Sequence, residues 1–147
     1  MRIDEIMKRE PESCAPGDLV QEVALKMKYH DCGLIPVVEE NGVRQPVGVI
    51  TDRDIACRLV AAGKVADQTR VEEIMTREVI TVNYQASFNA AIRLMEGHGV
   101  RRLVVTQGSG GLIGVLSLTD LARAVGRDRL GKLVQSLSAN QGGSEGI

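Results

Sequence analysis

The 147-residue sequence has very few aromatic residues: it contains no tryptophan, and only Tyr29, Tyr84 and Phe88 carry aromatic rings. Proteins that bind single-stranded nucleic acid stack successive bases on such rings, so this chain is poorly equipped for that role. An excess of charge of one sign is also lacking, because 18 basic and 19 acidic residues leave a net charge of −1. This balance argues against a basic patch for duplex nucleic acid or for an anionic membrane surface.

Long apolar runs and an even set of cysteines are lacking as well. No apolar stretch reaches the roughly 20 residues that cross a bilayer, and the first ten residues have no apolar signal core. The three cysteines, Cys14, Cys32 and Cys57, cannot all form disulfides within one chain. We therefore expect a cytoplasmic protein with reduced thiols, no membrane partner and no nucleic-acid partner.

The motifs of common enzymes are absent from the sequence, which has no P-loop, no G-x-S-x-G and no H-E-x-x-H. The glycine-rich residues 108–114 imitate a dinucleotide fingerprint, but they join two expected strands and therefore predict a turn. The two histidines, His30 and His98, have no plausible nucleophile near them in the sequence. We expect neither catalysis nor a required cofactor, and no cysteine or histidine spacing indicates a metal site.

The sequence contains an imperfect internal repeat. Residues 6–10 (I-M-K-R-E) recur at 74–78 (I-M-T-R-E), and residues 48–56 recur at 114–122. The first offset is 68 and the second is 66, so the first copy has two extra residues in the loop near 41–46. Loops tolerate such insertions. The predicted organisation is a first repeat at 1–62, a linker at 63–70, a second repeat at 71–126 and a tail at 127–147.

Each repeat predicts a short helical turn followed by the order β-α-β-β-α. Apolar residues recur at helical spacing in 19–27 and 88–95, and Asp18 is expected to cap the first of these helices with Gln21 as its reciprocal partner. One unit of about 60 residues buries little apolar area, so we expect two units packed with pseudo-twofold symmetry in an α/β (α+β) fold. The expected strand pairs are 34–38 with 47–50, and 103–106 with 112–116.

A further amphipathic stretch follows Gly126, with Leu130, Leu133, Val134 and Leu137 at helical spacing. This stretch could dock on the body of the molecule or on a second subunit. Residues 138–147, rich in Gly, Ser, Asn and Gln, predict a disordered end.

Each repeat closes with the motif G-h-h-[T/S]-x-x-D, in which h is apolar. Thr51 with Asp54, and Ser117 with Asp120, have the spacing of a capping box at a helix start. The same geometry suits a ligand, because backbone N–H groups at a helix start attract phosphate and a carboxylate can accept from both hydroxyls of a ribose. Gly48 would let another backbone or a ligand approach. The residues by themselves favour capping.

Arg101 and Arg102 open a strand of the second repeat, where the first repeat has Gly33 and Leu34. Guanidinium groups bind phosphate oxygens well, so the two sites are unequal and a phosphorylated ligand would favour the one that receives an arginine. A solvated strand entry is the alternative reading of this pair. Arg53 is a further phosphate candidate. An apolar slot for a base would come from strand entries and extended pieces, including Cys14, Thr81 and Val82, for which core packing is the alternative.

In their order, these segments resemble the CBS domain family as a tandem pair, or Bateman module. The resemblance rests on the leading I-M, the helices E-V-A-L-K-M and A-A-I-R-L-M, the strands G-L-I-P-V-V and R-R-L-V-V-T, and the doubled closing motif. It covers about residues 3–125 and looks most like the two-repeat proteins of this family that stand alone in prokaryotes.

The resemblance implies a regulatory module, often a homodimer, that binds an adenosine-type ligand between the repeats and signals to an unknown protein effector. AMP and ATP are the expected ligands, with ADP, NAD and S-adenosylmethionine left open. It implies that Asp54 and Asp120 hold ribose, and that Thr51 and Ser117 contact ribose or phosphate. The alternative is a dimerising interaction protein that binds no nucleotide, with the closing motifs acting only as helix caps.

Overall fold

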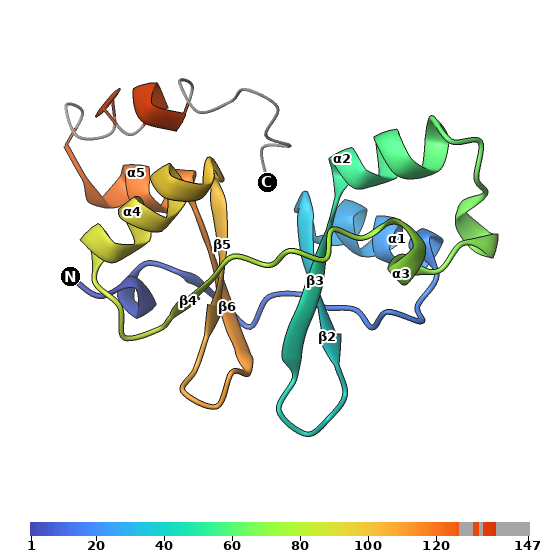
Figure 1. Cartoon of the computed structure of the whole chain (residues 1–147), viewed down its shortest axis with the longest axis horizontal. Coiled ribbons are helices and arrows are strands. Elements are labelled where there is room, and N and C mark those ends of the chain that lie inside the picture. Colours follow the sequence, from blue (N-terminus) through green and yellow to red (C-terminus); the bar gives the residue numbers. More distant parts are fainter. Residues whose placement is uncertain (127–130, 133, 138–147) are drawn as a thin grey trace. The chain divides into compact units, whose positions relative to one another are not determined.

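The computed structural model describes residues 1–126, 131–132 and 134–137, and the chain divides into two compact units (Figure 1). The terminal unit contains Met1–Glu10, Ile80–Ser109 and the described residues from Ile113 onward. The central unit contains Pro11–Val79 and Gly110–Leu112. Each unit combines helices with strands, which confirms the expected mixed α/β class. The pseudo-twofold packing stays a prediction.

The central unit is built around an antiparallel pair of strands in which Ile35 lies opposite Ile50. Both isoleucines are fully buried, as the apolar strand patterns predict. In chain order its elements are α1 (Val20–His30), β2 (Leu34–Glu39), β3 (Gln45–Thr51), α2 (Asp52–Asp54), the π-helix η2 (Ile55–Val60), the 3-10 turn η3 (Ala66–Gln68) and α3 (Val71–Ile74).

The terminal unit contains a four-stranded sheet in the order β1-β6-β5-β4, with β1 antiparallel to β6 and β4 parallel to β5. Helix α4 buries Phe88, Ala91, Ile92 and Met95, the residues whose spacing predicts this helix. In chain order the elements are η1 (Ile3–Glu5), β1 (Lys8–Arg9), β4 (Thr81–Asn83), α4 (Phe88–His98), β5 (Arg102–Thr106), β6 (Leu112–Ser117) and α5 (Leu118–Ala124).

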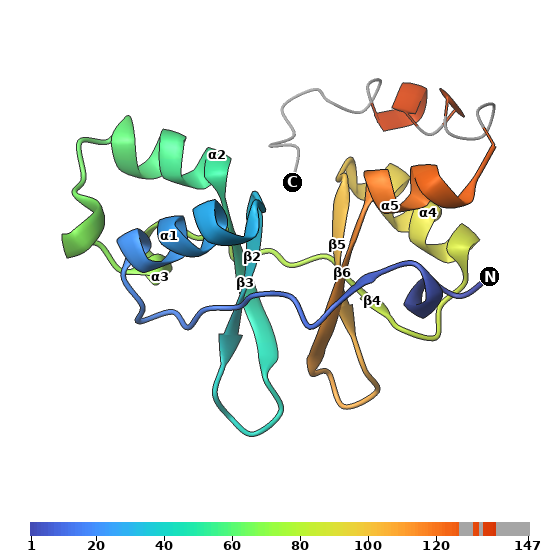
Figure 2. The same cartoon turned by 180° about the vertical axis from the view of Figure 1, so that it is seen from behind.

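The leading segments of the two sequence repeats are exchanged between the units. Lys8 and Arg9 precede the first repeat's strands, yet they pair with β6 in the terminal unit (Figure 2). Thr76 leads the second repeat, yet it pairs with Val49 of β3 in the central unit. The compact units and the sequence repeats are therefore different divisions of the chain, and each strand pair is completed by a segment from the other repeat.

The exchange requires glycine where each leading segment crosses its strand. A Cβ atom on Gly48 would lie 2.8 Å from the carbonyl oxygen of Thr76. A Cβ atom on Gly114 would lie 2.6 Å from Sδ of Met7 and 3.0 Å from the carbonyl oxygen of Lys8. The glycine that begins each closing motif thus allows a close backbone approach.

We expect Gly48→Ala and Gly114→Ala each to lower the free energy of unfolding by about 1–3 kcal/mol, because the added methyl group pushes against backbone. Gly97→Ala is the matched control, since a Cβ at this helical position meets nothing within 4 Å. The control should be neutral or stabilising by about 0.5–1 kcal/mol. Urea unfolding of the three variants measures these differences, and equal stability of all three would contradict the packing explanation.

The described part of the tail packs on the terminal unit, because Leu137 is 2% exposed and belongs to that unit's apolar core cluster. Val134, which the helical spacing places on the same apolar face, is 42% exposed and is therefore only partly covered. Of the two docking alternatives, the structure therefore shows the tail packed on the body of the molecule. Leu130, Leu133 and the predicted disordered end at 138–147 lie outside the described residues.

The predicted Asp18 cap is wrong. Leu19 occupies the N-cap position of α1 without a side-chain cap, and the Asp18 carboxylate instead accepts from the backbone N–H of Ala15 at 2.9 Å. The N–H of Val20 donates to the carbonyl of Thr69, 2.9 Å away. The carbonyl of Thr69, in the segment between the repeats, thus accepts from one of the free N–H groups at the start of α1. The Asp18 carboxylate is not needed there and instead closes the preceding turn.

Candidate ligand-binding site

Each closing motif forms the capping box that its spacing predicts. The Thr51 hydroxyl oxygen accepts from the N–H of Asp54 at 3.0 Å, and Oδ2 of Asp54 accepts from the N–H of Thr51 at 3.0 Å. The equivalent distances for Ser117 and Asp120 are 3.1 Å and 2.8 Å. The box engages one oxygen of each carboxylate, so the surroundings of the other oxygen decide what each aspartate can do.

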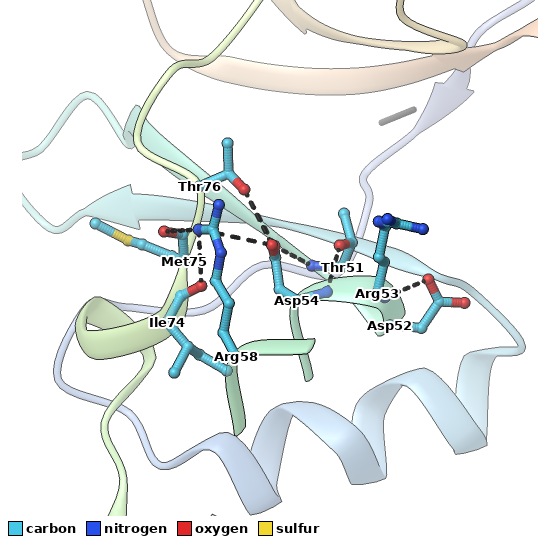
Figure 3. Close-up of polar contacts among 8 residues, drawn as sticks. All are labelled: Thr51, Asp52, Arg53, Asp54, Arg58, Ile74, Met75 and Thr76. Atoms are coloured by element: carbon cyan, nitrogen blue, oxygen red, sulfur yellow. Dashed lines mark hydrogen bonds and ion pairs between the residues drawn. The ribbon is translucent and has the colours of Figure 1, made fainter. Parts of the chain in front are cut away.

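The Asp54 carboxylate is buried and engaged by its own chain (Figure 3). The hydroxyl of Thr76 donates to it, with 3.1 Å to Oδ1 and 3.3 Å to Oδ2. Nη1 of Arg58 lies 3.8 Å from Oδ1. With the N–H of Thr51, these groups place donors or positive charge at both oxygens, so this aspartate is satisfied without a ligand.

The Asp120 carboxylate is more open. It is partly buried, and among the described residues its hydrogen-bond partner is Ser117, which donates to Oδ2. An open pocket of about 200 Å³ lies beside it, lined by Ile6, Asp120, Arg123 and Ala124. All four lining residues belong to the terminal unit. The pocket therefore lies next to a residue whose carboxylate still has acceptor capacity.

The other predicted residues of the first repeat gather near the start of α2. Leu34 lies opposite Thr51 across the strand pair, and the carbonyl of Gly33 accepts from the N–H of Asp52 at 3.0 Å. Arg53 is on α2 itself, beside the Asp54 network, and the ion pair of Asp54 is with Arg58 (Figure 3). The phosphate-binding role of Arg53 stays a prediction.

The predicted residues of the second repeat gather in the terminal unit. The carbonyl of Arg101 accepts from the N–H of Leu118 at 2.8 Å, which places Arg101 beside the start of α5. Arg102 begins β5, and Thr81 and Val82 lie on the neighbouring β4, opposite Val104 and Val105. The backbone of Arg101 thus lies next to the helix start that carries the Ser117 motif, and Arg102 follows it in the chain. The predicted contacts of these residues with phosphate and with a base stay predictions.

Cys14 lies beside β2, where its backbone forms an isolated parallel β-bridge with Val37. Its side chain belongs to the apolar core of the central unit. Burial raises the pKa of its thiol to about 12, and the nearby Asp18 carboxylate acts in the same direction. The side chain is therefore a neutral thiol at physiological pH. Core packing, the alternative reading of this residue, accounts for its position.

We expect Cys14 to react with iodoacetamide at pH 8 at least about 100-fold more slowly than Cys57 in the folded protein, because the thiolate is the reactive form. Cys57 is exposed, whereas Cys14 is buried. Peptide mass spectrometry of timed samples measures both rates, and unfolding in urea provides the control in which the rates converge. Equal rates in the folded protein would contradict the assigned burial.

Two further findings concern the described residues. They contain no cluster of three or more His, Cys, Asp or Glu side chains placed to hold a metal ion. Within the same part of the chain, none of the helices combines the length and apolar character that a bilayer span requires.

Sequence reasoning missed the residues that make the two aspartates unequal. Arg58 follows Asp54 by four positions, so helical spacing could have indicated the contact. Thr76 gave no such signal, because it comes from the leading segment of the other repeat. For the same reason, Ile6 in the pocket beside Asp120 could not be inferred from local spacing.

Comparison with known proteins gives the same outcome for both halves of the chain. The family model described as "CBS domain" matches residues 3–61 and again residues 71–127. An uncharacterised protein of Methanopyrus kandleri is 34% identical over 119 residues, which are 81% of this chain. The match spans 60% of that relative's length.

Two solved structures of similar proteins contain adenosine compounds. A CBS domain protein from Pyrobaculum aerophilum, complexed with AMP, is 31% identical with a TM-score of 0.77, and the match covers 92% of this chain and 99% of that one. The CBS domain pair of protein MJ0100, in complex with 5′-methylthioadenosine and S-adenosyl-L-methionine, is 26% identical with a TM-score of 0.75. That match covers 86% of this chain and all of that one (100%).

Proposed function

This chain belongs to the CBS domain family, and we propose that it is a regulatory module that binds an adenosine nucleotide and passes its bound state to a protein partner. The two similar structures support the ligand class, since one holds AMP and the other holds S-adenosyl-L-methionine with 5′-methylthioadenosine. A ligand that binds one conformation better than another shifts the population, and a partner can read that shift. The proposed assembly is a homodimer in the cytoplasm.

The observation that carries the proposal is the open carboxylate of Asp120 beside a pocket. A ribose presents two neighbouring hydroxyl donors, and an ionised carboxylate has acceptor sites for both. Ligand pockets usually span about 300–1,000 Å³, so a pocket of about 200 Å³ suits one part of a nucleotide, such as its ribose. We assign the ribose to Asp120 and Ser117, the phosphate to Arg101 or Arg102, and the base to the neighbourhood of Thr81 and Val82.

A second candidate is an interaction protein that binds no nucleotide. Both capping boxes are closed within the chain, so the closing motifs have a structural role that needs no ligand. Helix α1 also presents two large apolar side chains to solvent, Leu25 at 50% and Tyr29 at 85% exposure. Large exposed apolar groups that lie four positions apart on a helix suit a protein contact.

Thermal unfolding with a panel of adenosine ligands separates the two candidates. The panel contains AMP, ADP, ATP, NAD and S-adenosylmethionine, with guanosine monophosphate as the control for the base. A ligand at 100 times its dissociation constant stabilises the folded state by about 2.7 kcal/mol. For a chain of this length the expected rise in Tm is about 5–10 °C. A rise with one adenosine ligand supports the regulatory module, whereas a flat panel supports the interaction protein.

A further inference from the structure

The two closing motifs are equivalent in sequence but differ in what faces their aspartates. Asp54 faces Arg58 and the hydroxyl of Thr76, both from the central unit. At the offsets of the repeat, the equivalents of Arg58 and Thr76 are Ala124 and Lys8. Ala124 is one of the residues that line the pocket beside Asp120. The open site therefore has a methyl group where the closed one has a guanidinium.

Arg58 is held in place from two sides (Figure 3). Its Nη1 donates to the carbonyl oxygens of Ile74 at 3.3 Å and Met75 at 3.1 Å, where α3 ends. The same nitrogen lies 3.8 Å from Oδ1 of Asp54. Cations near a helix C-terminus interact favourably with its free carbonyls, and arginine stays charged at every physiological pH. The guanidinium is thus a permanent partner for this carboxylate.

We propose that Arg58 is the specificity-determining residue that closes the Asp54 site in cis and leaves Asp120 as the single nucleotide site of the chain. This inference rests on the proposed function, because it states which of the two aspartates receives the adenosine ligand. A ribose at Asp54 would have to displace the Thr76 hydroxyl and separate a carboxylate from its cation. A ribose at Asp120 would meet an acceptor that is already open, so binding there carries no such penalty.

The test counts bound AMP per chain by isothermal titration calorimetry. Wild type should bind one AMP, and Arg58→Ala should bind two, because the Asp54 carboxylate then loses its cation and a ribose hydroxyl has only the hydroxyl of Thr76 to displace. Ala124→Arg places the same side chain four positions after Asp120 and should abolish binding at that site. Arg77→Ala is the matched arginine control, since Arg77 lies beside Thr76 and donates to the Glu72 carbonyl. This variant should bind as wild type does.

The outcomes separate the inference from the function on which it rests. Two AMP per wild-type chain would overturn the closed site and leave the nucleotide-binding function intact. No binding by wild type would contradict that function and the assignment of Asp120, whereas a gain of one site in Arg58→Ala would still support the closing role of Arg58. An unchanged number of sites in Arg58→Ala overturns the inference in every case. Circular dichroism verifies folding, and Arg58→Gln replaces the alanine variant if that variant does not fold.

Discussion

Replacing Asp120 with alanine should lower the affinity for AMP by at least about 100-fold and leave the fold in place. A hydrogen bond to a charged group contributes about 1.5–3 kcal/mol, and two ribose hydroxyls would lose such a partner. Each 1.4 kcal/mol corresponds to about a factor of ten in affinity. The structural cost should be small, because among the described residues this carboxylate bonds only to Ser117. Loss of that part of the capping box should cost about 1 kcal/mol.

Titration calorimetry of Asp120→Ala with AMP measures the affinity, and thermal unfolding without ligand measures the fold. Asp67→Ala is the control for a lost negative charge, because Asp67 is exposed on η3 in the other unit. The control should bind AMP as wild type does. Undiminished affinity in Asp120→Ala would remove Asp120 from the ligand site and weaken the proposed function.

Replacing Asp54 with alanine should have the opposite outcome, a loss of stability of about 2–4 kcal/mol, because this buried carboxylate serves several partners. The substitution leaves the N–H of Thr51 and the hydroxyl of Thr76 without their acceptor. It also leaves the guanidinium of Arg58 without its counter-ion, although this side chain is 45% exposed and water can replace part of the loss. The capping box at the start of α2 is lost as well.

Urea unfolding of Asp54→Ala measures this change, and a fall in Tm of about 5–15 °C should accompany it. Asp52→Ala is the matched control, because Asp52 is the exposed aspartate two positions earlier and, within the described part of the chain, its carboxylate accepts from the neighbouring N–H of Arg53. Its cost should stay below about 1 kcal/mol. Similar stability of the two variants would show that the Asp54 network contributes little to folding.

The two alanine variants thus test whether the same motif binds a ligand at Asp120 and stabilises the fold at Asp54. If Asp120→Ala loses mainly affinity and Asp54→Ala loses mainly stability, then the repeat has diverged into one ligand site and one structural site. If both variants lose only stability, the closing motifs are helix caps and the interaction protein becomes the better reading. Local spacing is the same in both motifs, so spacing alone cannot separate these outcomes.

Much of the fold follows from local patterns in the sequence. Apolar residues at helical spacing predict α4, and the apolar stretches around Ile35 and Ile50 predict the strands β2 and β3. The capping boxes at Thr51 and Ser117 also follow from spacing, because their bonds span three residues and depend on backbone geometry nearby. The doubled order of these elements is enough to indicate the CBS domain family.

The tertiary structure decided which distant segments complete each local element. A carbonyl from Thr69 satisfies the start of α1, so the Asp18 cap that local spacing predicts is not needed. Likewise, Thr76 crosses from the other repeat to bond Asp54, and Ile6 crosses to line the pocket beside Asp120. Periodicity reports which face of an element is apolar, but it carries no information about which remote polar group reaches a given carboxylate. That depends on how the chain returns through space, and here it makes two sequence-equivalent aspartates chemically different.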